Sequence, residues 1–384
     1  MTKLAVVGLL LLMAAAGARA EETLKVGVIA QFSGPFADFG QQIGNGIDLY
    51  IQQHGPVAGK KVEILRRDPA GPNAERSKQL AQELVVRDKV DFIAGIDFTP
   101  IAFAIAPIIT EAKVPTVVMN AATLIIPDRS PYFVRFASAL DTLEEKFGEW
   151  AAMNGLKNCY VVVSDYVAGH AAGDAFKKSF TAHGGEIVGE TGVPLEGLDF
   201  AAYVQRIADA KPQAIFVFLS STKQSMQFSK LYAQTGLKAA GTKLLGGTDL
   251  FDASGNNDSD DAVGAYSVQN YSWTIDTPMN HEYVAAYEAA FGKSPHPDFM
   301  SVSAYDGMAG IYRVAEKLNG KIDGDRAIAA FKGIAFDSPR GPISIDGPTR
   351  DVVQPIYIRQ VVREKGELIN KEIYTFPNVP NRHN

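Results

Sequence analysis

Cysteine is nearly absent from the sequence, since Cys159 is the single one among 384 residues. An intramolecular disulfide is therefore excluded, even for a protein that folds in an oxidising compartment. Cys159 lies in the apolar stretch NCYVVV, where a free thiol is usually buried and unreactive. The fold must depend on a large apolar core, which a chain of this length can build.

Positive charge is also in short supply. The chain has 37 Lys and Arg residues against 43 Asp and Glu residues, which gives a formal net charge of −6 at pH 7. A nucleic-acid-binding protein needs a basic face for the phosphates. The composition therefore argues against nucleic acid as a partner.

Signatures of catalysis and of metal binding are missing. The sequence contains no G-x-S-x-G and no H-E-x-x-H, and none of its six histidines has another histidine four residues away. The acidic stretch 252–261 resembles an EF-hand loop, but Asn257 and Val263 stand where such a loop needs glycine and glutamate. We expect no metal and no cofactor. We also expect no enzyme activity, because no nucleophile, base and orienting group occur together.

Long apolar runs are confined to the N-terminus. Residues 1–20 start with the basic Lys3, continue with an apolar run from Leu4 to Ala16, and end with the small residues Ala18 and Ala20 before a cleavage site. This pattern is typical of a secretory signal peptide, and its apolar part is shorter than the roughly 20 residues of a transmembrane helix. We expect an exported, soluble mature chain.

What the sequence does contain is a regular alternation of strand and helix patterns. Short apolar runs predict strands at 24–30, 61–67, 90–96, 115–120, 158–164, 185–190, 214–220 and 242–247. Between them, apolar residues recur at spacings of three and four, as in Leu140, Leu143, Phe147 and Trp150, which predicts helices. Nearly continuous apolar strands are typical of parallel sheets covered by helices on both faces. The sequence therefore predicts an α/β fold with two Rossmann-like lobes.

The last third of the chain has too few elements for a third domain. It shows helical patterns at 280–291 and 299–318, followed by two short strand patterns. We expect these elements to complete the two lobes. Lobe 1 is then predicted to comprise residues 21–138 and 270–338, and lobe 2 residues 139–269 and 339–384, with three crossings between them.

Polar residues follow the predicted strands, at the position where open α/β sheets bind ligands. The stretch FIAGIDFTPIAFAIAP, residues 92–107, changes from a strand pattern to a helix pattern at Asp97 and Thr99. Thr99 followed by Pro100 is typical of a helix N-cap and the first helical residue. The Thr99 hydroxyl either caps the helix alone or also faces a bound carboxylate, together with neighbouring N–H groups.

Several longer stretches occur in a characteristic order. They are KVGVIAQFSGPFADFGQQIGNGIDLYI, FIAGIDFTPIAFAIAPIITEAKVPTV, NAAT, DYVAGHAAGDAFKKSFTAHGGEIVGE and SAYDGMAGIYRVAE. In this order and spacing they resemble the leucine/isoleucine/valine-binding protein family, the type I periplasmic solute-binding proteins of ABC importers. The resemblance covers essentially the whole mature chain. It implies two lobes joined by three crossovers, a ligand enclosed between them, a periplasmic location and a membrane permease as partner.

The resemblance also implies ligand-binding residues in lobe 1. Thr99 matches the hydroxyl residue that meets the ligand carboxylate, and Ala121 and Thr123 of NAAT match a pair that contributes backbone groups and a second hydroxyl. Phe39 matches an aromatic residue near the apolar part of the ligand. Asp97 stands where amino-acid binders usually carry an apolar residue. A buried lone carboxylate is costly, so Asp97 either faces solvent or bonds a polar group of the ligand.

In lobe 2, amino-acid binders of this family hold the ligand ammonium with an acidic residue, and the stretch GGTDLFD places Thr248 or Asp249 at that position. Ala168 stands where those binders carry an aromatic residue, so that Tyr166 compensates from two positions earlier or the pocket is larger. Tyr166 and Phe218 are the side chains expected to pack on the apolar body of the ligand.

The resemblance implies a receptor that captures a small carboxylate, most simply a hydrophobic amino acid of the branched-chain type, closes by a hinge and delivers it to the permease. Two alternatives stay open. One is an aromatic or other organic carboxylate that lacks an amine, and the other is a soluble sensory receptor.

Overall fold

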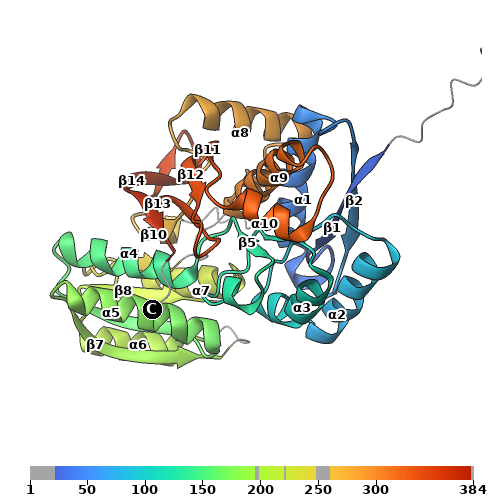
Figure 1. Ribbon diagram of the computed structural model, residues 1–384. Coiled ribbons are helices and arrows are strands. Elements are labelled where there is room, and N and C mark those ends of the chain that lie inside the picture. The colour runs from blue at the N-terminus through green and yellow to red at the C-terminus, as the bar shows by residue number, and fades with distance from the viewer. Residues whose placement is uncertain (1–21, 195–198, 220–221, 248–259, 382–384) are drawn as a thin grey trace, which may run out of the picture.

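The computed structural model describes residues 22–194, 199–219, 222–247 and 260–381, and its elements form two lobes (Figure 1). We call lobe 1 the five-stranded sheet with the helices that pack on it, and lobe 2 the nine-stranded sheet with its helices. Short helical turns lie at Gly34–Phe36, Glu83–Arg87, Pro127–Arg129 and Asp260–Ala262.

Lobe 1 has a parallel sheet with the strand order β2-β1-β3-β4-β5. The strands are β1 (Thr23–Ile29), β2 (Lys61–Arg67), β3 (Phe92–Gly95), β4 (Thr116–Val118) and β5 (Phe133–Arg135). The helices are α1 (Ala37–His54), α2 (Ala74–Gln82), α3 (Thr99–Ala112), α8 (Pro278–Phe291), α9 (Phe299–Lys317) and α10 (Gly324–Phe331). Helix α9, from the last third of the chain, packs beside α1 in this lobe.

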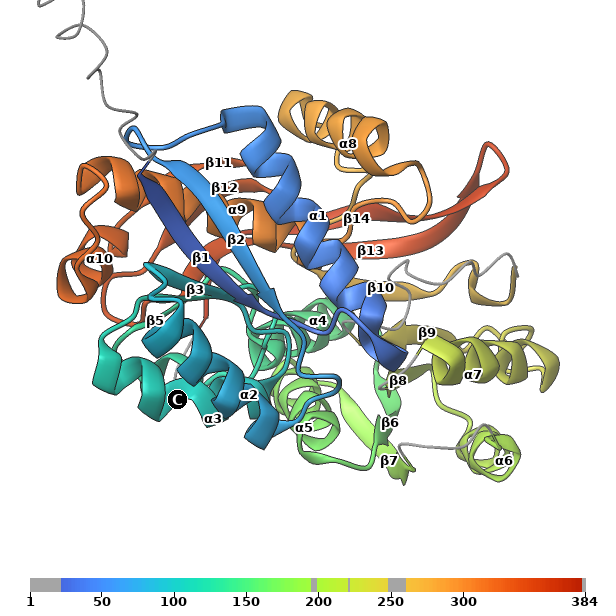
Figure 2. The ribbon, with the colours of Figure 1, turned by 90° about the vertical axis from the view of Figure 1, so that its right-hand side faces the viewer.

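Both faces of this sheet are buried. Val26 and Val28 of β1 pack with α1, α9 and α10 on one face, whereas Ile29 packs with α2 and α3 on the other. Figure 2 shows α1 on one side of β1 and β2, and α2 and α3 on the opposite side. Side chains that alternate between two covered faces explain why the strands read as continuous apolar runs.

Lobe 2 has the strand order β11-β12-β13-β10-β9-β8-β6-β7, with β14 paired to β13. The strands are β6 (Asn158–Ser164), β7 (Glu186–Val193), β8 (Ala214–Phe218), β9 (Lys243–Gly246), β10 (Tyr266–Gln269), β11 (Ala335–Ser338), β12 (Gly341–Ile345), β13 (Val352–Glu364) and β14 (Glu367–Pro380). The helices are α4 (Leu140–Met153), α5 (Val167–Ala182), α6 (Ala201–Ala210) and α7 (Thr222–Gln234). Again the faces alternate, because Val161 and Val163 pack with α4 and α5, and Val162 packs with α6 and α7.

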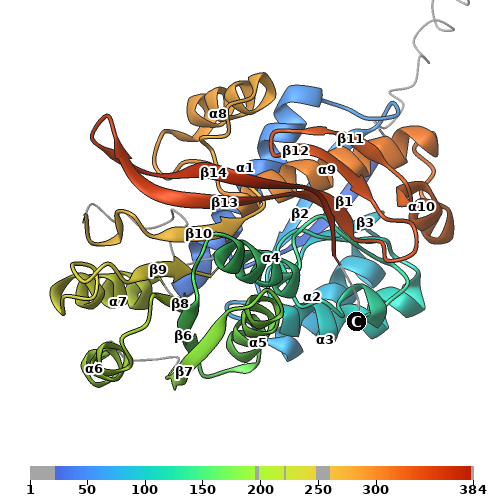
Figure 3. The ribbon, with the colours of Figure 1, turned by 90° about the vertical axis from the view of Figure 1, so that its left-hand side faces the viewer.

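The sheet of lobe 1 is parallel throughout, whereas the sheet of lobe 2 is mixed. Strands β6 to β10 are parallel, but β13 runs antiparallel to β10, β12 and β14. The β13–β14 hairpin is long and extends well beyond the rest of the sheet in Figure 3. The chain reverses at Lys365 and Gly366, and both residues have positive φ angles, as tight hairpin turns require.

The chain crosses between the lobes at 136–139, at 269–277 and over the third crossover, which we define as residues 338–354. Strand β12 illustrates why this last boundary is gradual. It hydrogen-bonds to the lobe 2 sheet, but Ile343 and Ile345 are buried in the lobe 1 core. The predicted lobe limits at 138, 269 and 338 therefore stay a prediction.

None of the helices in the described parts of the chain is long and apolar enough to span a membrane. The same residues contain no group of three or more His, Cys, Asp or Glu side chains placed to hold a metal ion.

Candidate functional site

Three loops of lobe 1 meet at one edge of its sheet. They follow β1, β3 and β4, which are neighbouring parallel strands, so their carboxyl ends lie together. Ligands of open α/β sheets bind at this edge. The predicted residues Phe39, Asp97, Thr99, Ala121 and Thr123 all belong to these loops or to the helix starts that follow them.

A pair of hydroxyl groups stands at the start of α3. The Oγ1 atoms of Thr99 and Thr123 are 2.7 Å apart, although the residues are separated by 24 positions. Thr99 is the first residue of α3 and Phe98 is its N-cap, so the predicted N-cap role of Thr99 is wrong by one position. The Thr99 hydroxyl is instead hydrogen-bonded to Thr123, at the positive end of the helix dipole. This position suits a carboxylate.

The turn that carries Thr123 is fixed by hydrogen bonds to its backbone carbonyls. Arg135 donates from Nη1 to the Thr123 carbonyl at 2.7 Å, and the Leu140 N–H donates to the Ala122 carbonyl at 2.9 Å. The Ala121 N–H donates to the Ile96 carbonyl at 2.9 Å, so this N–H is already paired within lobe 1. We expect the Thr123 hydroxyl, rather than the Ala121 N–H, to be the group that this turn offers to a ligand.

Three phenylalanines form an aromatic platform, and one of them, Phe98, directly precedes Thr99. The rings of Phe39 and Phe98 stack with centroids 5.5 Å apart, and Phe36 lies edge-on to both at 5.8 and 5.0 Å. Of these three residues, the resemblance implied a ligand contact for Phe39 alone. The available signals for the others were the spacing of three residues between Phe36 and Phe39, and the position of Phe98 directly before Thr99.

Asp97 lies behind this surface and joins its loops. Its side chain is 2% exposed, so the alternative in which it faces solvent is wrong. Its Oδ2 accepts the N–H of Gln31 at 2.7 Å, and the Gln31 side-chain amide in turn exchanges hydrogen bonds with the backbone of Gly71. Burial raises the pKa of the Asp97 carboxyl to about 6. The carboxylate therefore links the loops after β1, β2 and β3.

The backbone before Asp97 is strained. Ile96 has a φ of 59°, which is unusual for a β-branched residue, and its N–H donates to the Ile29 carbonyl at 2.8 Å. Strain of this kind persists only where the surroundings impose it, and it gathers at binding sites. Glycine and asparagine are the residues that usually indicate a left-handed backbone conformation in a sequence. Ile96 is neither, so this conformation could not be predicted from the residue type.

Lobe 2 contributes apolar groups close to the Thr123 turn. Tyr166 is the N-cap residue of α5, and Phe218, 4% exposed, ends β8. Both belong to the same apolar cluster as Ala168, and Ala122 from the lobe 1 turn packs on that cluster too. The NAAT turn of lobe 1 thus packs against the apolar core of lobe 2. Thr248 and Asp249 lie outside the described residues.

A cavity of about 700 Å³ lies elsewhere in lobe 2, lined by Asn154, Lys211, Gln213 and Lys243 among others. These residues precede or begin β6, β8 and β9, so the cavity is at the amino ends of the strands. None of the predicted site residues lines it. Ligands of open α/β sheets bind at the opposite ends, and we do not assign the solute site to this cavity.

Comparison with known proteins agrees with this geometry. Residues 23–367 match the family described as periplasmic binding protein. The chain belongs to this family. A curated relative, Leu/Ile/Val-binding protein homolog 6 of Brucella suis biovar 1 (strain 1330), is 41% identical over 383 residues, which is 98% of this chain and 97% of the relative.

Solved structures of the periplasmic binding protein family superpose closely on this chain. The solute-binding protein of an ABC transporter from Rhodopseudomonas palustris BisB5, in complex with 3,4-dihydroxybenzoic acid, is 47% identical with a TM-score of 0.88, covering 94% of this chain and 99% of that one. The corresponding protein from Rhodopseudomonas palustris HaA2, in complex with p-hydroxybenzoic acid, is 42% identical with a TM-score of 0.89, covering 94% and 98%. The present protein is a periplasmic solute-binding protein of an ABC transporter.

Proposed function

We propose that this protein binds an aromatic carboxylate of the hydroxybenzoate class and delivers it to a membrane permease. The observation that carries the proposal is the Thr99–Thr123 hydroxyl pair together with the Phe39–Phe98 ring stack, in which Phe98 is the residue directly before Thr99. A flat molecule with a carboxylate at one end needs these two features next to each other. The Rhodopseudomonas palustris relatives, which bind such acids, support the choice.

The hydroxyl pair can donate to a carboxylate without rearrangement. In a hydroxyl–hydroxyl hydrogen bond one O–H is used, and the other O–H is left to donate to a third group. With Thr99 and Thr123 at 2.7 Å, that remaining O–H would donate to a carboxylate held at the start of α3. Hydrogen bonds to a charged acceptor are roughly twice as strong as neutral ones, and they strengthen when closing lobes exclude water.

The ring of the ligand would pack on the aromatic platform from lobe 1 and on Tyr166 and Phe218 from lobe 2. Aromatic pairs add about 0.5–1.5 kcal/mol beyond the area that they bury. Hinge closure over the ligand, which is the switching mode of periplasmic binding proteins, would bring the two apolar walls onto opposite faces of one ring.

A hydrophobic amino acid is the second candidate. The names of the curated relatives favour it, since they are called Leu/Ile/Val-binding protein homologs. It needs a partner for the ligand ammonium, which the resemblance assigns to Thr248 or Asp249. Against it, Ala168 replaces the aromatic residue of amino-acid binders.

Isothermal titration calorimetry of the mature protein with 4-hydroxybenzoate, 3,4-dihydroxybenzoate, leucine and phenylalanine separates the two candidates. We expect heat from the aromatic acids and none from the amino acids. The double variant Thr99→Val/Thr123→Val is expected to bind the acids about 100-fold more weakly, because the charge-assisted hydrogen bond to the carboxylate and the hydroxyl that orients its donor are both lost. Binding of leucine without binding of either hydroxybenzoate would overturn the proposal.

The matched control is Thr110→Val, near the other end of α3. The Thr110 hydroxyl donates to the Ala106 carbonyl at 2.7 Å and is also hydrogen-bonded to the Ser130 hydroxyl. This variant loses a threonine hydroxyl from the same helix and is expected to keep the wild-type affinity. A loss of affinity as large as that of the double variant would mean that the hydroxyls act through the stability of α3.

A further inference from the structure

A buried ion pair joins β5 of lobe 1 to the third crossover. Arg135 donates from Nε to Oδ1 of Asp351 at 2.6 Å and from Nη2 to Oδ2 at 3.0 Å, and the two side chains are 0% and 1% exposed. The Arg135 N–H also donates to the Arg350 carbonyl at 3.0 Å, in an isolated parallel bridge. The two-pronged geometry fixes the orientation of the guanidinium as well as its position.

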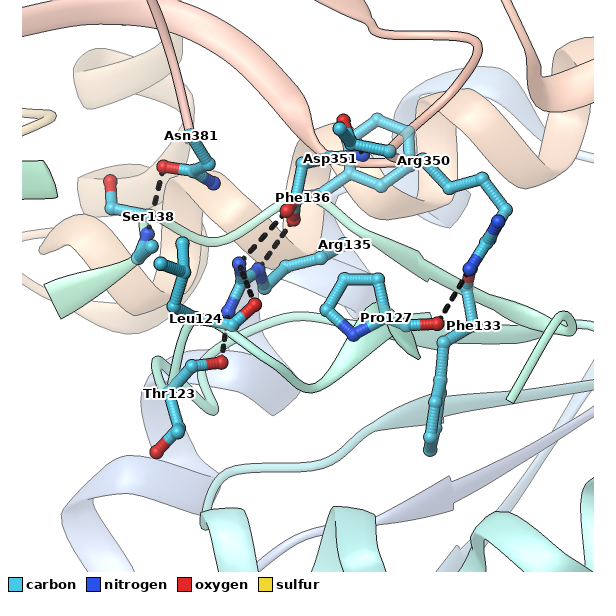
Figure 4. A network of polar contacts seen from close by, with 12 residues as sticks. Thr123, Leu124, Pro127, Phe133, Arg135, Phe136, Ser138, Arg350, Asp351 and Asn381 are labelled. Atoms are coloured by element: carbon cyan, nitrogen blue, oxygen red, sulfur yellow. Dashed lines mark hydrogen bonds and ion pairs between the residues drawn. The ribbon is translucent and has the colours of Figure 1, made fainter. Parts of the chain in front are cut away.

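The free edge of the same guanidinium holds the turn that carries Thr123. Arg135 donates from Nη1 to the Thr123 carbonyl at 2.7 Å and from Nη2 to the Leu124 carbonyl at 3.4 Å (Figure 4). The next crossover residue, Arg350, donates from Nη2 to the Pro127 carbonyl at 2.5 Å. One end of the turn is therefore connected to the crossover through Arg135 and Asp351, and the other end is held directly by Arg350.

Stability alone does not account for this pair. Burying two charges costs solvation that their attraction often only balances, so a buried pair is weak support for a role in stability. Here one arginine directs four N–H contacts to a crossover carboxylate and to two carbonyls of a single turn. A lysine has three donors on one nitrogen and cannot span these positions.

We propose that Arg135 is a positioning residue for solute binding, through which the third crossover and the Thr123 turn move together. When the crossover bends, Asp351 turns the guanidinium, and the guanidinium shifts the Thr123 carbonyl and with it the hydroxyl that faces Thr99. Solute capture and lobe closure then favour one another. This inference rests on the proposed function, because it takes Thr123 to be a contact of the solute.

The molecule supplies its own control. Arg340 and Asp306 form a second buried pair, 2.7 Å from Nε to Oδ2, with exposures of 0% and 1%. Arg340 also lies in the third crossover and donates to the Phe136 carbonyl at 2.9 Å and to Gln354 Oε1 at 2.7 Å. Among the described residues its hydrogen bonds reach none of residues 120–127.

The test compares Arg135→Lys with Arg340→Lys in the mature protein. Both variants should lose stability in urea unfolding, because each replaces the arginine of a buried ion pair by a lysine with fewer donors. We expect Arg135→Lys to weaken 4-hydroxybenzoate binding by about tenfold, mostly through faster dissociation in stopped-flow measurements, and Arg340→Lys by less than about threefold. Equal affinity losses in the two variants, or no loss in Arg135→Lys, would overturn the inference.

Two further measurements keep the result interpretable. If Arg135→Lys does not fold, the double variant Arg135→Gln/Asp351→Asn replaces both charges together, which is less costly than leaving one charge unpaired. The same tenfold loss of affinity is expected from it. If the wild-type protein binds leucine and no hydroxybenzoate, the proposed ligand is wrong and the comparison is made with leucine.

Hydrogen exchange of the ligand-free proteins gives a readout that needs no ligand. The Ile126 N–H donates to the Thr123 carbonyl at 3.2 Å, and its exchange reports on the turn. It should exchange faster in Arg135→Lys than in Arg340→Lys. Equal exchange in the two variants would overturn the inference even if no solute has been found.

Discussion

The two lobes turn from their first strand into a helix in the same way. In lobe 1, a Cβ atom added to Gly40 of α1 would lie 2.0 Å from the Gln31 carbonyl oxygen. In lobe 2, a Cβ atom added to Gly169 of α5 would lie 2.0 Å from the Ser164 carbonyl oxygen. Each helix therefore starts directly against the end of a strand, and only glycine permits the contact.

The lobes differ in how the loops around this contact are braced. In lobe 1 the buried carboxylate of Asp97 binds the backbone of Gln31. In lobe 2 the loop after β6 carries the acidic residue Asp165, which pairs with His170 at 2.8 Å while the two side chains are 69% and 49% exposed. The lobe that we propose to hold the charged end of the solute thus has two loops tied by a buried polar contact. In the lobe that would cover the apolar end, the Asp165 contact stays within one loop and the following helix, and it is exposed to solvent.

The largest expected effect tests the shared part of the comparison. Gly40→Ala and Gly169→Ala should each destabilise the protein by about 3 kcal/mol or more, because backbone oxygens cannot move away from the added methyl group. Urea unfolding measures the change. Similar losses in both variants are expected, since the two contacts are equally close.

Gly44→Ala is the matched control for the glycine variants. It lies in the same helix as Gly40, and the nearest atom to its added Cβ would be 3.7 Å away, an ordinary contact. Alanine is the better helix former by about 1 kcal/mol, so this variant should be neutral or more stable. A loss of stability in Gly44→Ala equal to that in Gly40→Ala would remove the close approach as the cause.

The difference in bracing predicts a difference in pH dependence. Because burial raises the pKa of Asp97 from 3.8 to about 6, the folded state holds its proton at pH values where the unfolded state has lost it. Its contribution to stability is therefore fully present below about pH 4 and is lost as the pH rises through 6. The loss is on the order of 3 kcal/mol.

Asp97→Asn removes this dependence, since an amide oxygen can still accept the Gln31 N–H. Relative to the wild type, the variant should gain stability progressively between pH 4 and pH 7 in urea unfolding. Asp165→Asn, in the exposed pair of lobe 2, should differ from the wild type by less than about 1 kcal/mol across that range. Parallel pH profiles for wild type and Asp97→Asn would show that the two acids are not braced differently.

The comparison also explains what the sequence could reveal. Strand β6 was predicted with its observed bounds, Asn158–Ser164, because it is buried on both faces and reads as an unbroken apolar run. Strand β14 was not predicted. Among the described residues its pairing partner is β13 alone, and its sequence mixes Lys371 and Glu372 with apolar residues. Its formation therefore depends on the partner strand rather than on a local pattern.

The site residues that could be predicted are those whose side chains have a distinctive functional group, such as the threonine hydroxyl. Thr99 and Thr123 were found through the resemblance, and the structure brings them together. The contact of Asp97 with Gln31 spans 66 positions, and it uses a backbone N–H that every residue possesses. No pattern along the chain marks such a contact, so its discovery required the fold.

The smallest expected effect distinguishes the apolar walls of the two lobes. Phe39→Leu keeps an apolar side chain but removes the ring that stacks on Phe98 at 5.5 Å. It should weaken 4-hydroxybenzoate binding by roughly three- to tenfold, the worth of one aromatic contact, and cost less than about 1.5 kcal/mol in stability. Tyr166→Leu removes a ring from the lobe 2 wall and should have an effect of similar size.

Titration of benzoate and cyclohexanecarboxylate against both variants then decides whether ring stacking is the cause, because an acid without an aromatic ring should lose little affinity on Phe39→Leu. If both acids lose equally, Phe39 acts by filling space, and the aromatic platform does not select for aromatic solutes.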